Sequence, residues 1–266
     1  MYLFYTDESN LDPAAGEFFV YGGIAVPTDA ASQLSEALEK ARSQAPLPAQ
    51  ALLKFGPKPT ELDWEAFNAL KQAYLDSAAS VGCVFIVSTL LHKIAPSPDV
   101  ARRFEINRAL YYFDCLMHRR SDFGLVLVDR FSDSQIDAQL RERFSIGVTG
   151  LPYTDPYRLT RVLGFHYSCI GQSHFSSLID IAIGSFRYAV NAFSQGGPTR
   201  LATARSLLAL LSPLFLRNIN GEVSTISLHF SPDTVRVPAY RARYDALKAF
   251  LSDAGLPTSQ DISDAS

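Results

Sequence analysis

Short apolar runs that alternate with helix-length segments are the feature that most constrains how this chain can fold. Residues 2–6 and 124–129 are mainly apolar without alternation, which is typical of strands buried on both faces of a sheet. Residues 18–26 form another strand-like run, which Pro27 ends. Asn, Asp, Pro and Gly occur between the first two runs, at 10–16, so we expect a hairpin connection and an antiparallel pair.

The remaining segments extend this pattern to a mixed sheet. Residues 82–91 and 160–169 are predicted to be strands. Helical spacing of apolar residues predicts helices at 29–43, 61–79, 99–119, 133–144 and 175–193. A right-handed crossover would place the strand at 124–129 parallel to the first strand. The predicted fold class is therefore α/β, with a mixed five-stranded sheet, flanking helices and a helical insertion (about 28–80) after the second strand.

The helix at 99–119 also carries a prediction about the core. Its aromatic and aliphatic residues at helical spacing are expected to face the sheet. These residues are Phe104, Leu110, Tyr111 and Leu116.

The domain organisation predicted from this order is simple. The 266 residues suit one large domain, which we expect over 1–195, with a C-terminal helical extension over 196–252 packed on the same domain. Residues 253–266 are mostly polar and lack a core pattern, so we expect a disordered tail there. Within the extension we expect two helices and a strand or hairpin, at residues 201–217, 238–251 and 222–230.

Composition and charge exclude several classes of protein. The net charge of -3 argues against a surface that is basic throughout, the usual property of a dedicated nucleic-acid binder, although a local basic groove stays open. The three cysteines form no C-x-x-C pair, so neither a cysteine zinc site nor a disulfide framework is expected. No run of about 18 apolar residues predicts a membrane span. The opening residues lack the pattern of a signal peptide, which leads us to expect a cytoplasmic protein.

Two acidic residues stand where predicted strands end, Asp7 after the first strand and Asp129 after the fourth. The carboxyl ends of parallel strands open into the usual ligand crevice of an open sheet. Two carboxylates placed there repel each other unless a cation lies between them, and Mg²⁺ and Mn²⁺ prefer such oxygen ligands. The alternative is that each Asp only begins a turn, since Asp is a common turn former.

Asp180 lies within the helix predicted at 175–193, on the side opposite its apolar stripe. Ser176, Gly184 and Arg187 share that side, and the small residues among them would allow a close approach to a neighbouring strand end. The helix could thus add a third carboxylate to the same site. The alternative is a solvated helix face on which Arg187 stabilises the charge.

Two further residues are weaker candidates. Glu8 follows Asp7 directly, and neighbours in a strand point to opposite faces, so both reach one metal site only if the strand ends at Asp7. A solvated edge residue is the alternative for Glu8. His174 precedes the Asp180 helix and could approach the site, although a surface loop position explains it as well. No H-E-x-x-H, P-loop or G-x-S-x-G motif is present.

Three segments of the chain resemble the domain-of-unknown-function family numbered 3800, over about residues 2–193. Asp7–Ser9 is similar to the family's opening Asp-Glu-Ser-Gly, with Asn10 in place of the Gly, and Leu125–Asp129 is similar to its apolar strand that ends in Asp. Ser177–Gly184 is similar to a helix with Gln-x-Ala-Asp-x-Ile-Ala-Gly, with Ser and Ile at the expected Gln and Ala positions. Because of these departures, the alternative that the metal site is degenerate stays open.

The resemblance implies a ribonuclease H-like fold and a metal-dependent nuclease, in some members directed against mobile elements. It also implies a functional lysine near Lys54. On this view Asp7, Asp129 and Asp180, with Glu8 as a further ligand, hold Mg²⁺ or Mn²⁺, and Lys54 or Arg130 offsets phosphate charge.

The predicted function is therefore phosphodiester hydrolysis of DNA or RNA by a two-metal mechanism. The sequence leaves open whether the chain also binds a protein partner or forms a homo-oligomer. The alternative is a non-catalytic ribonuclease H-like module that binds nucleic acid or protein.

Overall fold

A six-stranded mixed sheet forms the centre of the computed structural model, which describes residues 1–48, 51–130, 135–149 and 155–264. The order of strands across the sheet is β5-β4-β1-β2-β3-β6. In chain order the strands are β1 Tyr2–Ser9, β2 Phe18–Pro27, β3 Val84–Leu91, β4 Gly124–Asp129, β5 Val162–Ser168 and β6 Leu228–Ser231.

The pairing of the strands confirms the predicted α/β class and most of the predicted directions. β1 and β2 are antiparallel, as are β2 and β3, while β4 runs parallel to β1 and β5 parallel to β4. The predicted sheet had five strands, whereas the sixth, β6, joins the outer edge of β3 in parallel. β6 overlaps the segment 222–230 that was predicted as a strand or hairpin of the C-terminal extension, but its four residues carry no pattern that assigns them to the main sheet.

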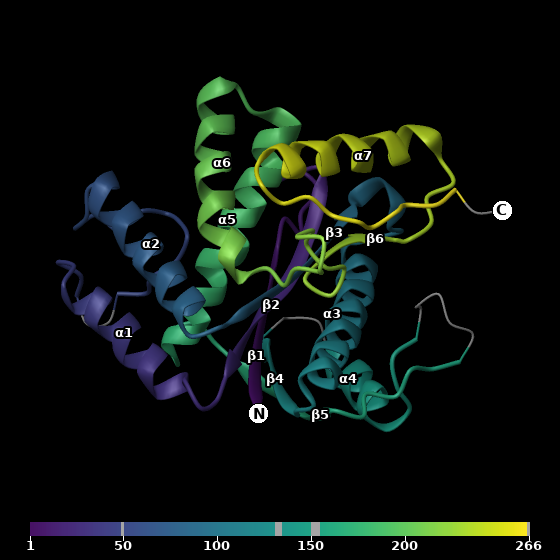
Figure 1. Ribbon diagram of the computed structural model, residues 1–266, viewed down its shortest axis with the longest axis horizontal. Helices are drawn as coiled ribbons and strands as arrows, with labels where there is room; N and C mark the ends of the chain where they lie inside the picture. Colours follow the sequence, from purple (N-terminus) through teal and green to yellow (C-terminus); the bar gives the residue numbers. More distant parts are fainter. Residues whose placement is uncertain (49–50, 131–134, 150–154, 265–266) are drawn as a thin grey trace.

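Helices cover both faces of the sheet, and Figure 1 shows them on either side of the strands. On one face, α1, α2, α5, α6 and α7 contribute to a core, and on the other face α3 and α4 contribute to a second core. The helices are α1 Ala31–Ser43, α2 Trp64–Ser80, α3 Pro98–Arg120, α4 Ile136–Ser145, α5 His174–Gln195, α6 Pro198–Leu211 and α7 Pro238–Asp253, with short 3-10 turns at His92–Ile94 and Ser212–Leu214.

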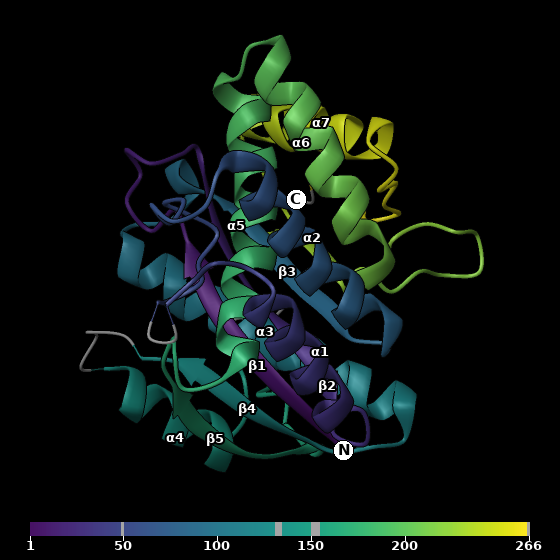
Figure 2. The ribbon, with the colours of Figure 1, turned by 90° about the vertical axis from the view of Figure 1, so that its left-hand side faces the viewer.

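The strand β2 shows why two cores form. Phe18 and Val20 pack into the core with α5, whereas their neighbours Phe19 and Tyr21 pack into the core with α3. Successive side chains of a strand point to opposite faces, so an all-apolar strand needs a cover on each side. The predicted insertion between β2 and β3, which is α1 and α2, supplies part of one cover (Figure 2).

The core prediction for α3 was partly wrong. Leu110 and Leu116 are buried as predicted, but Phe104 is 46% exposed. The buried residues of α3 include three charged ones, Arg102, Glu105 and Arg108. They are buried because Arg102 forms an ion pair with Glu8 of β1, and Arg108 forms ion pairs with Glu105 and with Asp233 after β6.

Residues 254–264, predicted to belong to a disordered tail, pack against the body of the protein. Leu256 and Ile262 are buried, and the side-chain amide of Gln260 bonds the backbone of Phe230 in both directions at 2.7 Å. Since β6 is an edge strand, its outer backbone groups need such partners. Isolated apolar residues that dock one at a time leave no periodic pattern in a sequence.

No helix within the described ranges has the length and apolar character needed to cross a membrane. The three cysteines Cys83, Cys115 and Cys169 are free.

Replacing Gln260 by Ala is expected to lower the free energy of unfolding by about 1–3 kcal/mol, because two buried backbone groups of Phe230 lose their partner. Denaturant melts of the purified protein measure this change. The matched control is Asp261→Ala at the neighbouring exposed position. Equal stability of the two variants would contradict the docked arrangement of residues 254–264.

Candidate functional site

All three predicted aspartates line one small pocket at the end of the sheet. The pocket has a volume of about 160 Å³ and is lined by Asp7, Asp129 and Asp180 together with Glu8 and Lys54. The remaining lining residues are Thr6, Ser168, Ile170, Ser176 and Ile179. We call this cavity the acidic pocket.

The strand pairing explains why Asp7 and Asp129 meet. β1 and β4 are parallel and adjacent, with Thr6 opposite Val128, so the residues that follow lie at the same edge of the sheet. Ser168 ends β5, the next parallel strand, opposite Asp129. Sequence reasoning missed Ser168, although the same strand-end rule would have identified it.

Asp180 reaches the pocket from α5, which packs across β1 and β2. Its Oδ2 accepts a hydrogen bond of 2.6 Å from the backbone N–H of Phe55, in the loop before α2. That loop approaches α5 at Gly184, where a Cβ atom would lie 2.4 Å from Phe55 Cβ. The small residue on this face therefore admits a loop, and not the strand end that we expected, and the loop brings Lys54 to the pocket.

Glu8 lines the pocket, but its carboxylate is already paired. Arg102 of α3 donates to both oxygens, with Nε 2.5 Å from Oε2 and Nη2 2.9 Å from Oε1. β1 continues through Ser9, so Glu8 turns toward α3 as the strand alternation requires. The Arg102–Glu8 pair thus ties the end of β1 to α3, which leaves Glu8 a weaker ligand candidate than the three aspartates.

Ser176 adds an unpaired polar group. Its residue is 6% exposed, and its hydroxyl has no hydrogen-bond partner in the described structure. Ser176 lies one turn before Asp180 on the same side of α5, a spacing that placed it beside Asp180 in the sequence analysis. A buried hydroxyl without a partner is costly, so its position in the pocket wall suggests that a further group binds there.

The other candidate residues lie around the acidic pocket without lining it. His174 lines a separate cavity of about 460 Å³, with Leu53 and Ser177. Arg130, which follows Asp129, is exposed. Arg187 stands two turns beyond Asp180 on α5, and its positive charge offsets a small part of the rise that burial causes in the pKa of Asp180.

Burial and mutual repulsion dominate the electrostatics of the pocket. Burial and, to a lesser extent, the charges of Asp129 and Asp180 raise the pKa of Asp7 to about 8, although the hydrogen bond from the Glu8 N–H opposes this shift. Burial also raises the pKa of Asp129 and of Asp180, while Lys54 lowers both. Without a cation in the pocket, Asp7 therefore retains its proton at neutral pH.

The donor chemistry of the pocket fits a hard divalent cation, since carboxylate and hydroxyl oxygens line it and a bound cation could take the place of the proton on Asp7. The side chains are, however, arranged more openly than the ligands around a bound metal ion. Within the described ranges, no group of three or more His, Cys, Asp or Glu side chains is arranged so that it could hold a metal ion. The three aspartates instead accept backbone N–H groups, Asp7 from Glu8, Asp129 from Arg130 and Asp180 from Phe55.

Comparison with known proteins gives no match for the chain, whether among family models, curated proteins or solved structures.

Gly184→Ala is expected to destabilise the protein by about 1–3 kcal/mol, the usual cost of overpacking, because the new methyl group would collide with Phe55. Thermal or denaturant melts measure the loss. The control is Gly164→Ala in β5, where the nearest atoms to a Cβ lie at 3.7 Å. If both variants were as stable as the wild type, Phe55 would not pack on α5 as described.

Asp7→Asn is expected to stabilise the metal-free protein, and more so as the pH rises. The folded-state pKa of Asp7 is about 8 against an ordinary value of 3.8, so folding favours the neutral carboxyl. The wild type therefore has its full stability from this group below about pH 4 and loses it progressively up to about pH 8. Asn does not titrate, so we expect a gain of at least about 1.4 kcal/mol at pH 8, the equivalent of one pKa unit.

Denaturant melts in EDTA at pH 5 and pH 8 measure the difference between the two proteins. A gain that stays constant between these pH values would show that Asp7 is not buried in the neutral form.

Proposed function

We propose that this protein cleaves phosphodiester bonds of nucleic acid with the help of divalent metal ions bound at the acidic pocket. The observation that carries the proposal is the convergence of Asp7, Asp129 and Asp180 with Lys54 in one pocket, from two strand ends, a helix and a loop. The raised pKa of Asp7 beside Asp129 and Asp180 and the unpaired hydroxyl of Ser176 both support a bound group at this place.

We further propose that the fold is ribonuclease H-like, as the resemblance to the domain-of-unknown-function family 3800 implies. The antiparallel meander of β1 to β3, followed by β4 and β5 in parallel beside β1, supports this assignment. Asn10 supports the resemblance as well. It stands where the family has Gly and adopts a φ of 59°, which asparagine tolerates better than most residues.

In this proposal Asp7, Asp129 and Asp180 hold Mg²⁺ or Mn²⁺ through their carboxylate oxygens. When bound, divalent cations neutralise phosphate charge and lower the pKa of a bound water. Lys54 adds a positive charge beside Asp129 and Asp180 and would offset charge on the phosphate. Glu8, paired with Arg102, holds the end of β1 in place so that Asp7 faces the pocket.

The neighbouring cavity of about 460 Å³ gives space for the nucleic-acid chain on one side of the cleaved bond. It is built from the same two segments as the acidic pocket, since Leu53 precedes Lys54 and Ser177 follows Ser176. Ser173, the N-cap of α5, also lines it, and a helix N-terminus favours phosphate groups.

A second candidate function is a non-catalytic module with the same fold that binds nucleic acid or protein. The open arrangement of the carboxylates favours it, because no three of the described His, Cys, Asp or Glu side chains are placed to hold a metal ion. The net charge of -3 also favours the non-catalytic module, because an acidic protein binds nucleic acid weakly unless a partner contributes basic residues.

Purified protein is expected to cleave at least one of single-stranded DNA, duplex DNA, RNA or hybrid duplex in Mg²⁺ or Mn²⁺, and Asp7→Asn is expected to abolish cleavage. Asn keeps the shape of Asp and its acceptor for the Glu8 N–H but removes the charge that binds metal. Gel assays with and without EDTA measure this. The matched control is Asp76→Asn, an exposed aspartate of α2.

Cleavage that persists in EDTA and in Asp7→Asn would indicate a contaminating nuclease. No cleavage of any substrate, together with no Mn²⁺ binding in calorimetry, would contradict the proposal and favour the non-catalytic module.

A further inference from the structure

A further cavity, distinct from both the acidic pocket and the neighbouring cavity of about 460 Å³, lies between α3 and the segments that follow β3 and β6. It has a volume of about 190 Å³, and most of its wall is apolar. The apolar lining residues are Leu90, Ile94, Ala95, Pro96, Phe104 and Pro232. Since Phe104 is 46% exposed and Pro96 is exposed, the cavity can be reached from solvent.

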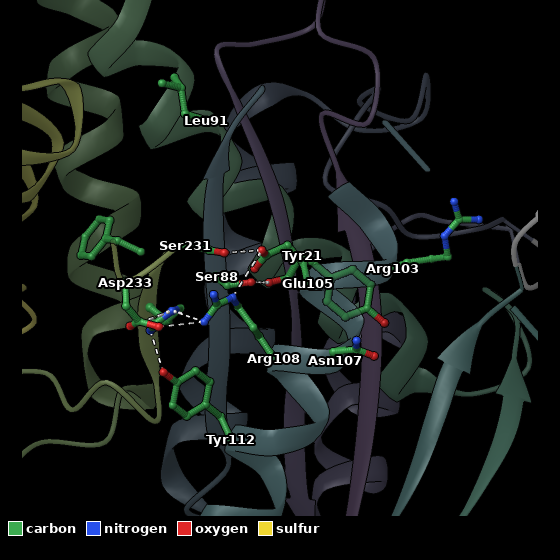
Figure 3. Close-up of polar contacts among 12 residues, drawn as sticks. Tyr21, Ser88, Leu91, Arg103, Glu105, Asn107, Arg108, Tyr112, Ser231 and Asp233 are labelled. Atoms are coloured by element: carbon green, nitrogen blue, oxygen red, sulfur yellow. Dashed lines mark hydrogen bonds and ion pairs between the residues drawn. The ribbon is translucent and has the colours of Figure 1, made fainter. Parts of the chain in front are cut away.

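Three polar residues complete the wall, and Glu105 is the most unusual of them (Figure 3). Glu105 is fully buried, and its Oε1 accepts a hydrogen bond of 2.5 Å from the hydroxyl of Ser231. Its Oε2 is buried without a hydrogen-bond partner among the described residues. The nearby hydroxyl of Ser88 donates instead to the backbone carbonyl of Tyr21, at 3.3 Å.

Arg108 does not supply the missing hydrogen bond to Oε2 of Glu105, because its guanidinium contacts other residues. Nη1 lies 3.1 Å from Asp233 Oδ2 and 3.1 Å from His229 Nε2, while the contact from Nε to Glu105 is 3.9 Å. Arginine only donates, so Nε2 of His229 accepts and the imidazole is neutral. Burial and the Arg108 charge accordingly hold the pKa of His229 well below its usual range.

The charges around the cavity therefore do not balance. Two carboxylates, Glu105 and Asp233, face the single guanidinium of Arg108, so one further positive charge would compensate them. Burial raises the pKa of Glu105, and the charge of Arg108 and the hydroxyl of Ser231 oppose this shift without cancelling it.

We propose that this cavity binds a small organic cation, a primary ammonium group on a compact apolar body. The ammonium donates to the free Oε2 of Glu105, and the apolar body fills the space between Leu90, Ile94 and Phe104. A cavity of about 150 Å³ is large enough for benzene, so a volume of about 190 Å³ suits one ring with a short aminomethyl arm. An anion is disfavoured because the donors of Arg108 that have short contacts are directed to His229 and Asp233.

The experiment is calorimetric and NMR titration of the full chain with benzylammonium, cyclohexylmethylammonium and n-butylammonium. Benzyl alcohol and benzoate serve as neutral and anionic analogues. We expect at least one of the ammonium compounds to bind at least tenfold more tightly than the alcohol, with no binding of benzoate. Absence of binding by all three cations, or benzoate binding as tightly, would overturn the proposal.

Two variants test the assignment of the site. Glu105→Gln keeps the shape but removes the charge, and we expect at least a tenfold loss of affinity, against no change in Glu39→Gln at an exposed position of α1. Ala95→Leu fills the cavity while leaving Glu105 intact, and we expect it to abolish binding even if Glu105→Gln fails to fold. Wild-type affinity in Ala95→Leu or in folded Glu105→Gln would overturn the proposal. These readouts do not depend on nuclease activity.

Discussion

The parallel pairing of β1 with β4 is the interaction on which the rest of the structure depends. It places Asp7 and Asp129 at one edge of the sheet, where the register of the strands fixes the backbone positions of both residues. α5 then packs across β1 and adds Asp180 to the same pocket. Backbone hydrogen bonding therefore holds buried charges together that would repel each other in water.

The surroundings of the pocket moderate this repulsion without removing it. The backbone N–H of Phe55 and the charges of Lys54 and Arg187 favour the ionised form of Asp180, yet its pKa is still raised by burial. For Asp7 the raised pKa means that metal-free folding favours a protonated carboxyl. A divalent cation that displaces this proton would draw the carboxylates inward, which explains how an open arrangement is compatible with the proposed metal site.

The central part of the fold and the grouping of the aspartates could be predicted because each depends on a local pattern. Asp7 and Asp129 follow buried strands, and the strand-end rule brings such residues together. The pairing of Glu8 with Arg102 could not be predicted, since the two residues are 94 positions apart and no periodicity links them. The exposure of Phe104 was missed for a related reason. Hydrophobic spacing assigned it to the core, whereas α3 buries charged residues that find partners on β1 and after β6.

A Mn²⁺-soaked crystal structure is the measurement that tests the central claim most directly, because anomalous scattering locates the metal independently of any activity. The account predicts one or two Mn²⁺ peaks in the acidic pocket, with Asp7, Asp129 and Asp180 as oxygen ligands, and two bound ions would lie about 3.5–4 Å apart. Mn²⁺ bound elsewhere on the protein, or an acidic pocket that stays without metal at saturating Mn²⁺, would contradict it.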